Sequence, residues 1–240
     1  MPVISLASPK GGAGKTTAAL LLATELAHAR EEFAVTLIDC DPRQWSIKWG
    51  QGGQVPNNMT IVPKPDEDKI LDAIVDAKSK TPFVIIDLEG TDSNLVAVAM
   101  SRSDLVIIPT QPGPMEGESA ADAIKMIKLQ ERIFERKIPY AVLMTRTSAA
   151  IKSKIEKDLV AQMQTAEIPI FATQLLERNA FRSIIDRQCP LWALPKSTSN
   201  LEAAKQNVRS FVGEVIDMFV VKKPEVRMEV VKTAKEEVIA

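Results

Sequence analysis

A turn rich in glycine and lysine stands near the start of the chain, between an apolar stretch and a longer amphipathic one. It consists of Lys10, Gly11, Gly12, Ala13, Gly14, Lys15, Thr16 and Thr17. Glycines let successive backbone N–H groups converge on phosphate oxygens, and the following helix adds the positive end of its dipole. Lys15 then places a cation at the β- and γ-phosphates, and the Thr16 hydroxyl is a ligand for Mg²⁺. The turn therefore predicts a nucleoside triphosphate site.

Carboxylates close two further apolar runs. Asp39 and Asp41 stand at the end of the apolar run at residues 34–40. Asp87 directly follows the apolar run Phe-Val-Ile-Ile at residues 83–86. A buried strand that ends in a carboxylate is explained if the charge meets a hydrated magnesium ion. Asp39 and Asp41 flank a single residue, Cys40, at the end of the run at residues 34–40. One carboxylate can face magnesium and the other the water, although a cap before Pro42 explains either aspartate taken alone.

Short β-branched runs alternate with longer amphipathic stretches along the chain. The runs predict strands at 3–8, 34–40, 83–88, 105–110 and 140–145, and the stretches predict helices at 16–30, 67–79 and 116–135. Several of these strands are apolar at every position, as expected of central parallel strands that helices cover on both faces. We therefore expect an α/β fold: a doubly wound, mostly parallel sheet with helices on both faces, in which ligands bind at the carboxyl ends of the strands.

The composition predicts one ordinary globular domain. The chain has 240 residues, of which 45% are hydrophobic and 25% charged, and its formal net charge is −1. We expect a single ATPase domain over residues 1–221 and, beyond the break near Pro224, a charged C-terminal tail over 222–240 that is helical or disordered. With so little net charge, any surface for nucleic acid or membrane must be local.

The two cysteines, Cys40 and Cys189, are too few for a disulfide scaffold and fit a reducing cytosol. The start of the chain has no basic leader followed by an apolar run, and no segment has the roughly 18 uninterrupted apolar residues of a membrane span. The expectation is a cytoplasmic protein with no integral membrane association.

The turn departs from the usual P-loop at one position, where Pro9 replaces the first glycine and Lys10 follows. This KGGxGKTT form resembles the deviant Walker A box of the ParA/MinD superfamily of P-loop ATPases, and the resemblance extends over most of residues 1–220. It is closest to small ParA-type partition ATPases without an N-terminal DNA-binding domain. The resemblance implies ATP or ADP and Mg²⁺ as cofactors, slow hydrolysis of ATP, and a homodimer formed on ATP binding. In that dimer Lys10 reaches the partner's phosphates; a solvated loop lysine is the alternative.

The same resemblance assigns roles to the strand-end residues. Asp41 positions or activates the attacking water, Asp39 supports the magnesium shell, and Asp87 occupies the Walker B position. Thr145 and Arg146 follow the last predicted strand, where many relatives carry an asparagine that reads adenine. The Thr145 hydroxyl can still bond a base edge, and the preference for ATP over GTP rests on the resemblance alone.

Basic residues outnumber acidic ones between residues 146 and 209. Small ParA proteins use basic residues in the matching region to hold non-specific DNA in the ATP dimer. The candidates for this role are Arg178, Arg182, Arg187 and Lys196. An ordinary solvated face, with arginines paired to Glu177 and Asp186, is the alternative.

Three functions fit these features. The first is an ATPase that partitions plasmid or chromosomal DNA or other cargo, nucleoid-associated if it binds DNA, with a centromere-binding or cargo adaptor that stimulates hydrolysis. The second is a positioning switch that resembles MinD or conjugation-associated ATPases and acts at a membrane, a pole or an organelle. The third resembles the nitrogenase iron protein and is disfavoured, because no suitable pair of cysteines follows Asp87.

Overall fold

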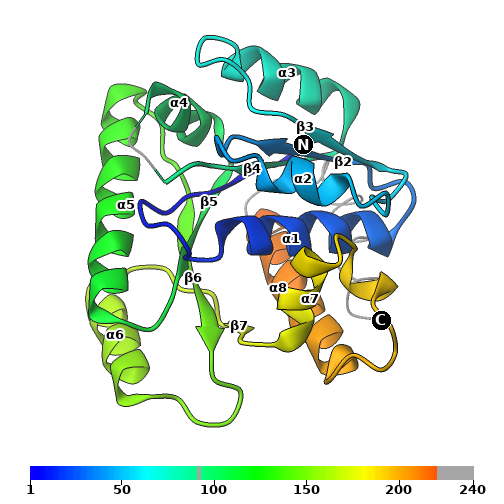
Figure 1. The fold of residues 1–240 in the computed structure, drawn as a ribbon. Coiled ribbons are helices and arrows are strands. Elements are labelled where there is room, and N and C mark those ends of the chain that lie inside the picture. The colour runs from blue at the N-terminus through cyan, green and yellow to red at the C-terminus, as the bar shows by residue number, and fades with distance from the viewer. Residues whose placement is uncertain (91–92, 221–240) are drawn as a thin grey trace.

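The computed structural model describes residues 1–90 and 93–220, which form three layers with a parallel sheet in the middle (Figure 1). The sheet has seven strands in the order β3-β2-β4-β1-β5-β6-β7, and every pair of neighbours is parallel. The strands are β1 Val3–Leu6, β2 Val35–Asp39, β3 Met59–Val62, β4 Phe83–Asp87, β5 Leu105–Thr110, β6 Tyr140–Thr147 and β7 Leu175–Leu176. The predicted doubly wound parallel sheet is confirmed.

Helices cover both faces of this sheet and bury one hydrophobic core on each side. The first core is covered by α1 Lys15–Ala29, α2 Trp45–Gly50, α7 Asn179–Asp186 and α8 Leu201–Val220. The second core is covered by α3 Ile70–Lys80, α4 Asn94–Arg102, α5 Pro114–Ile133 and α6 Lys154–Thr165. In Figure 1, α4, α5 and α6 lie on the opposite side of the sheet from α1, α7 and α8.

Strand β4 shows why the central strands are apolar throughout. Phe83 and Ile85 pack into the first core, whereas Val84 and Ile86 pack into the second. All four side chains are at most 2% exposed. Burying a side chain of this size contributes about 1.5–3 kcal/mol. An alternating pattern would leave one face of this strand polar, so the uninterrupted run follows from the two-sided cover.

The predicted strands and helices are all present, with ends that differ by a few residues. The short elements α2, β3 and β7, and the helices α4, α6, α7 and α8, were not predicted. The predicted tail at 222–240 lies outside the described residues. Within residues 1–90 and 93–220, no helix combines the length and the hydropathy that crossing a bilayer requires.

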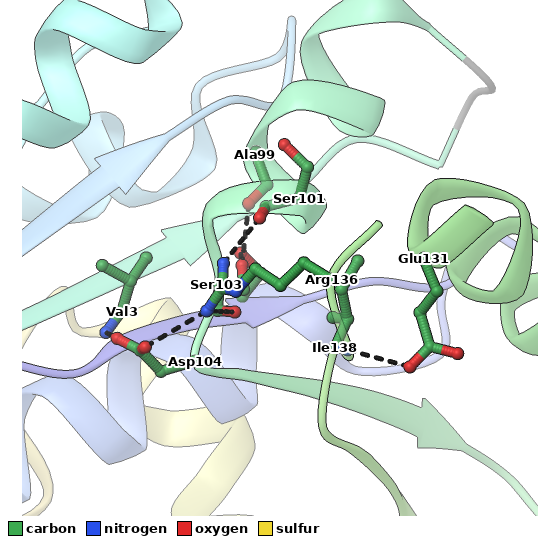
Figure 2. Close-up of polar contacts among 9 residues, drawn as sticks. Val3, Ala99, Ser101, Ser103, Asp104, Glu131, Arg136 and Ile138 are labelled. Carbon is green, nitrogen blue, oxygen red and sulfur yellow. Dashed lines mark hydrogen bonds and ion pairs between the residues drawn. The ribbon is translucent and has the colours of Figure 1, made fainter. Parts of the chain in front are cut away.

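A polar cluster ties the end of α4 to the amino ends of the strands, away from the predicted ligand edge (Figure 2). The Arg136 guanidinium donates to the carbonyl oxygens of Ser101 at 2.6 Å and Ser103 at 3.0 Å. It also contacts Asp104 at 3.3 Å, and the other carboxylate oxygen of Asp104 accepts a hydrogen bond from the Val3 amide at 2.9 Å. Arg136 thus satisfies carbonyl groups at the end of α4 and orients the carboxylate that holds β1.

Replacing Arg136 with alanine is expected to lower the free energy of unfolding by about 1–3 kcal/mol, because it leaves these carbonyl groups and Asp104 without their charged donor. Urea unfolding measures the loss. The exposed Arg132 on α5 gives a matched control, since Arg132→Ala removes the same charge. Equal stability of the two variants would contradict the role assigned to the cluster.

Candidate functional site

The glycine-rich turn between β1 and α1 has the curled backbone that a phosphate site requires. Gly12 has φ 82° and Gly14 has φ 96°, both in the left-handed region that favours glycine. A Cβ atom added at Gly11 or Gly12 would meet no heavy atom within 4 Å, so the outer side of the turn is open. The turn therefore leaves space for a ligand along its backbone, at the carboxyl end of β1.

Lys15 is the buried cation of the site and is only 8% exposed. Its Nζ donates to the carbonyl oxygens of Ser8 at 3.1 Å and Lys10 at 3.4 Å. Burial lowers the pKa of Lys15, and the nearby carboxylates of Asp87 and Asp41 act in the opposite direction. The ammonium group thus lies within the turn, between main-chain oxygens and two acidic side chains.

The ends of three neighbouring strands hold the turn in place. After β5, the Gln111 Nε2 donates to the Gly12 carbonyl at 2.6 Å. On β6, the Thr145 hydroxyl donates to the Ala13 carbonyl at 2.8 Å. After β4, a Cβ atom added at Gly90 would lie 3.0 Å from the Pro9 carbonyl, so only glycine fits without a shift. Thr145 therefore supports the loop, and Gln111 is a contributor that the sequence analysis missed.

Asp87 is fully buried, and neither of its carboxylate oxygens has a hydrogen-bond partner of normal geometry. Burial raises its pKa from 3.8 to about 7, and the neighbouring Asp39 acts in the same direction, while Thr16 and Lys15 oppose them. An unpaired buried carboxylate is costly unless a cation completes it. Mg²⁺ binds through one or two carboxylates together with phosphate oxygens and waters. Asp87, with Thr16 beside it, fits such an ion.

Asp39 and Asp41 have different surroundings. Asp39 is fully buried, and its oxygens accept hydrogen bonds from the backbone N–H groups of Asp41 at 3.2 Å, Ser46 at 2.8 Å and Ile47 at 3.0 Å. It therefore anchors the start of α2. Asp41 is partly exposed and accepts one hydrogen bond from the Arg43 amide at 2.8 Å. The magnesium role of Asp39 and the water-positioning role of Asp41 stay predictions.

A cleft of roughly 380 Å³ adjoins the phosphate loop and extends towards α7. Its lining comes from the loop and α1, from the end of β6, and from the segment that runs from β7 into α7. The lining residues are Gly14, Thr17, Thr145, Arg146, Leu175, Leu176, Glu177, Arg178, Phe181, Arg182, Ile185 and Asp186. Arg146 is the extra residue of a bulge against β7 and has φ 51°. The bulge places this exposed arginine at the cleft.

The four basic residues predicted to bind DNA do not all line the same hollow. Arg178 and Arg182 line the cleft. The Nε of Arg178 is buried without a hydrogen-bond partner, and Arg182 pairs with Glu177. Arg187 is exposed just after α7, and Lys196 lies in a separate hollow before α8. The role of these four residues in DNA binding stays a prediction.

Trp49 connects the two ends of the site. Its indole Nε1 donates to the Ile184 carbonyl at 2.9 Å, and the side chain is 2% exposed. Trp49 belongs to α2, which Asp39 anchors beside the phosphate loop, and Ile184 belongs to α7, which lines the cleft. The hydrogen bond therefore joins α2, which lies beside the glycine-rich turn, to α7, which lines the cleft.

A parallel sheet with a curled glycine loop, a buried lysine and a strand-end aspartate at the same edge defines a P-loop nucleoside triphosphatase. The VirC1 protein family matches residues 1–216. Protein ParA of Rhizobium radiobacter is 36% identical over 211 residues, which cover 88% of this chain and 94% of that protein. The chain therefore belongs to the VirC1 family and, with it, to the ParA/MinD superfamily of partition and positioning ATPases.

Two solved structures have the same fold at low identity. Apo McdA of Cyanothece has a TM-score of 0.72 and 15% identity, over 90% of this chain and 99% of that one. The septum site-determining protein MinD of Pyrococcus horikoshii has a TM-score of 0.69 and 18% identity, over 93% and 99%. The MinD structure contains Mg-ADP, which agrees with the cofactors expected from the sequence. The predicted superfamily is confirmed.

Replacing Asp87 with asparagine is expected to flatten the pH dependence of stability in the nucleotide-free protein. The pKa of Asp87 is raised in the folded state to about 7, so its contribution is favourable at low pH and is lost as the pH rises through that value. Between about pH 5 and about pH 7.5 the wild type should lose about 2–3 kcal/mol that the variant keeps. Urea unfolding at both pH values measures the difference, and parallel losses in the two proteins would refute it.

Proposed function

We propose that this chain is an ATP-dependent switch that binds Mg-ATP, pairs with a second copy, and hydrolyses ATP slowly to partition or position cargo. The observation that supports this most directly is the open glycine loop beside the buried, unpaired carboxylate of Asp87. We also propose that residues 1–221 act as one ATPase domain, since the two cores share a single sheet.

Each residue of the site has one task in this proposal. The backbone N–H groups of residues 10–17 bind the phosphates, and Lys15 neutralises the β- and γ-oxygens. Thr16 and Asp87 hold magnesium, which when bound neutralises charge on the phosphate oxygens. Thr145 and Arg146 border the cleft for the base. Lys10 adds a second cation that meets the phosphates of the paired copy.

The reaction is attack of water on the γ-phosphorus, with cleavage of its bond to the β,γ-bridging oxygen and release of ADP and phosphate. Asp41 orients the water, which its partly exposed position on the loop after β2 permits. Catalysis then comes from positioning and charge neutralisation, since the site offers no covalent nucleophile for this step. A slow reaction of this kind suits a timer whose two nucleotide states differ in what they bind.

Two substitutions separate binding from turnover. Lys15→Ala is expected to abolish ATP binding or turnover, because the loop loses its buried cation. Asp41→Ala is expected to retain binding and lose turnover by about 10²-fold or more, since only the water is misplaced. Calorimetry with Mg-ATP and phosphate release measure the two properties. An Asp41→Ala protein that hydrolyses ATP at the wild-type rate would overturn the assignment.

Non-specific DNA is the platform that we propose for the partition function, with an adaptor protein that stimulates hydrolysis. The relationship to protein ParA supports this, as does the exposed Arg187 near the end of α7. Pairing would double each basic contact, so affinity should fall steeply with salt. A positioning role at another platform is the second candidate, supported by the likeness to McdA and to the septum site-determining MinD.

Co-sedimentation with plain duplex DNA tests the platform, using ATP and ADP at about 50 mM and about 200 mM salt. Binding is expected with ATP only and should weaken strongly at the higher salt. Arg187→Ala is expected to weaken DNA binding and leave nucleotide affinity intact, whereas Arg178→Ala, at the cleft, is expected to alter nucleotide affinity. DNA binding that ignores the nucleotide would exclude a DNA-based switch and favour the second candidate.

A further inference from the structure

Lys10, the first lysine of the turn, is held by a residue of its own chain. Its ammonium group forms an ion pair with Glu116 in the first turn of α5. The Lys10 side chain is 39% exposed and that of Glu116 is 23% exposed, so the pair lies at the rim of the site. The hydrogen bond from Lys10 lowers the pKa of Glu116, which keeps this carboxylate ionised.

The Glu116 carboxylate lies against the backbone of Gly113 and borders a small cavity next to Lys10. A Cβ atom added at Gly113 would lie 2.1 Å from the Glu116 Oε2, so the carboxylate occupies space that any other residue at 113 would take. A cavity of about 20 Å³ adjoins Lys10, Gln111, Glu116 and Ser119, enough for about one water molecule. The Ser119 hydroxyl that faces it has no hydrogen-bond partner.

We propose that Glu116 is a positioning residue for Lys10: it holds the lysine on its own chain while the site is empty and competes with bound phosphate for it. The ammonium group of Lys10 cannot contact Glu116 and a phosphate of the paired copy at the same time, so each contact excludes the other. This inference rests on the proposed function, in which Lys10 meets the phosphates of the paired copy. Removing the carboxylate then favours the nucleotide-bound, paired state.

Three single variants test this by sedimentation velocity across a titration with Mg-ATP. Glu116→Gln keeps the shape and removes the charge, and should lower the concentration for half-maximal pairing by about two- to five-fold, the range of a partly exposed ion pair. Gly113→Ala keeps the charge but displaces the carboxylate, and should act in the same direction. Glu118→Gln is the matched control on the same helix, because it removes an equal charge away from Lys10, and should behave as the wild type.

A double-variant cycle separates positioning from general repulsion between Glu116 and phosphate. In a Lys10→Ala background, Glu116→Gln should have no further effect on pairing, whereas simple repulsion would leave its effect intact. In steady-state kinetics Glu116→Gln should lower KM with kcat unchanged, because it removes a contact made only before binding. A change in thermal stability alone would indicate a merely structural role at the start of α5.

The outcomes distinguish this inference from the function on which it rests. If the wild type pairs with Mg-ATP but Glu116→Gln and Glu118→Gln are indistinguishable, the positioning role is overturned and the proposed function stands. An effect of Glu116→Gln that persists unchanged in the Lys10→Ala background overturns the role in the same way. If the wild type neither binds Mg-ATP nor pairs, both are overturned.

Discussion

The nucleotide site depends on the burial of the Lys15 ammonium group, which lies against the main-chain carbonyl oxygens of Ser8 and Lys10. The carboxylates of Asp87 and Asp41 act on the same group. Asp39 and Asp87 are direct register partners on β2 and β4, so two like charges lie side by side in the interior. Such a pair is unfavourable without a cation nearby and hydrogen bonds to the ionised form. Lys15 offsets part of the cost for Asp87, and three backbone amides do so for Asp39. The remaining cost at Asp87 is one that a bound cation would relieve.

The fold brings these groups together because the carboxyl ends of its parallel strands lie at the same edge of the sheet. The loop follows β1, Asp39 and Asp41 come at the end of β2, and Asp87 ends β4. Gln111 follows β5, and Thr145 lies near the end of β6.

The central strands and the loop were predictable because their signals are local. An apolar run such as Phe83 to Ile86 or a glycine-lysine turn carries its meaning within a few residues. The elements that were missed depend on distant partners instead: β7 has two residues, and α2 has six and begins where Asp39 binds its amides. Neither has enough local propensity to form alone. Their positions follow from tertiary contacts that no short window contains.

The basic residues predicted to bind DNA show the same limit of sequence-based prediction. The sequence indicated a basic region that includes Arg178 and Arg182, but it could not show that these two residues border the cleft next to Gly14. Gln111 and Glu116 were missed although both follow a strand end, which is the position where useful polar groups were expected. Their partners lie about a hundred residues earlier in the chain, as the separations of 99 and 106 residues show. The strand-end rule locates such residues, but only the packed structure identifies what they bind.

The single hydrogen bond from Trp49 to Ile184 has a thermodynamic consequence. It joins α2, which Asp39 anchors beside the glycine-rich turn, to α7, which lines the cleft. A binding event that moved α7 away from α2 would have to break this bond. Coupling of that kind is reciprocal, so a ligand that moved α2 would change the affinity of α7 for its own ligand to the same degree. One buried indole N–H therefore makes the position of the cleft wall depend on the position of the helix beside the turn.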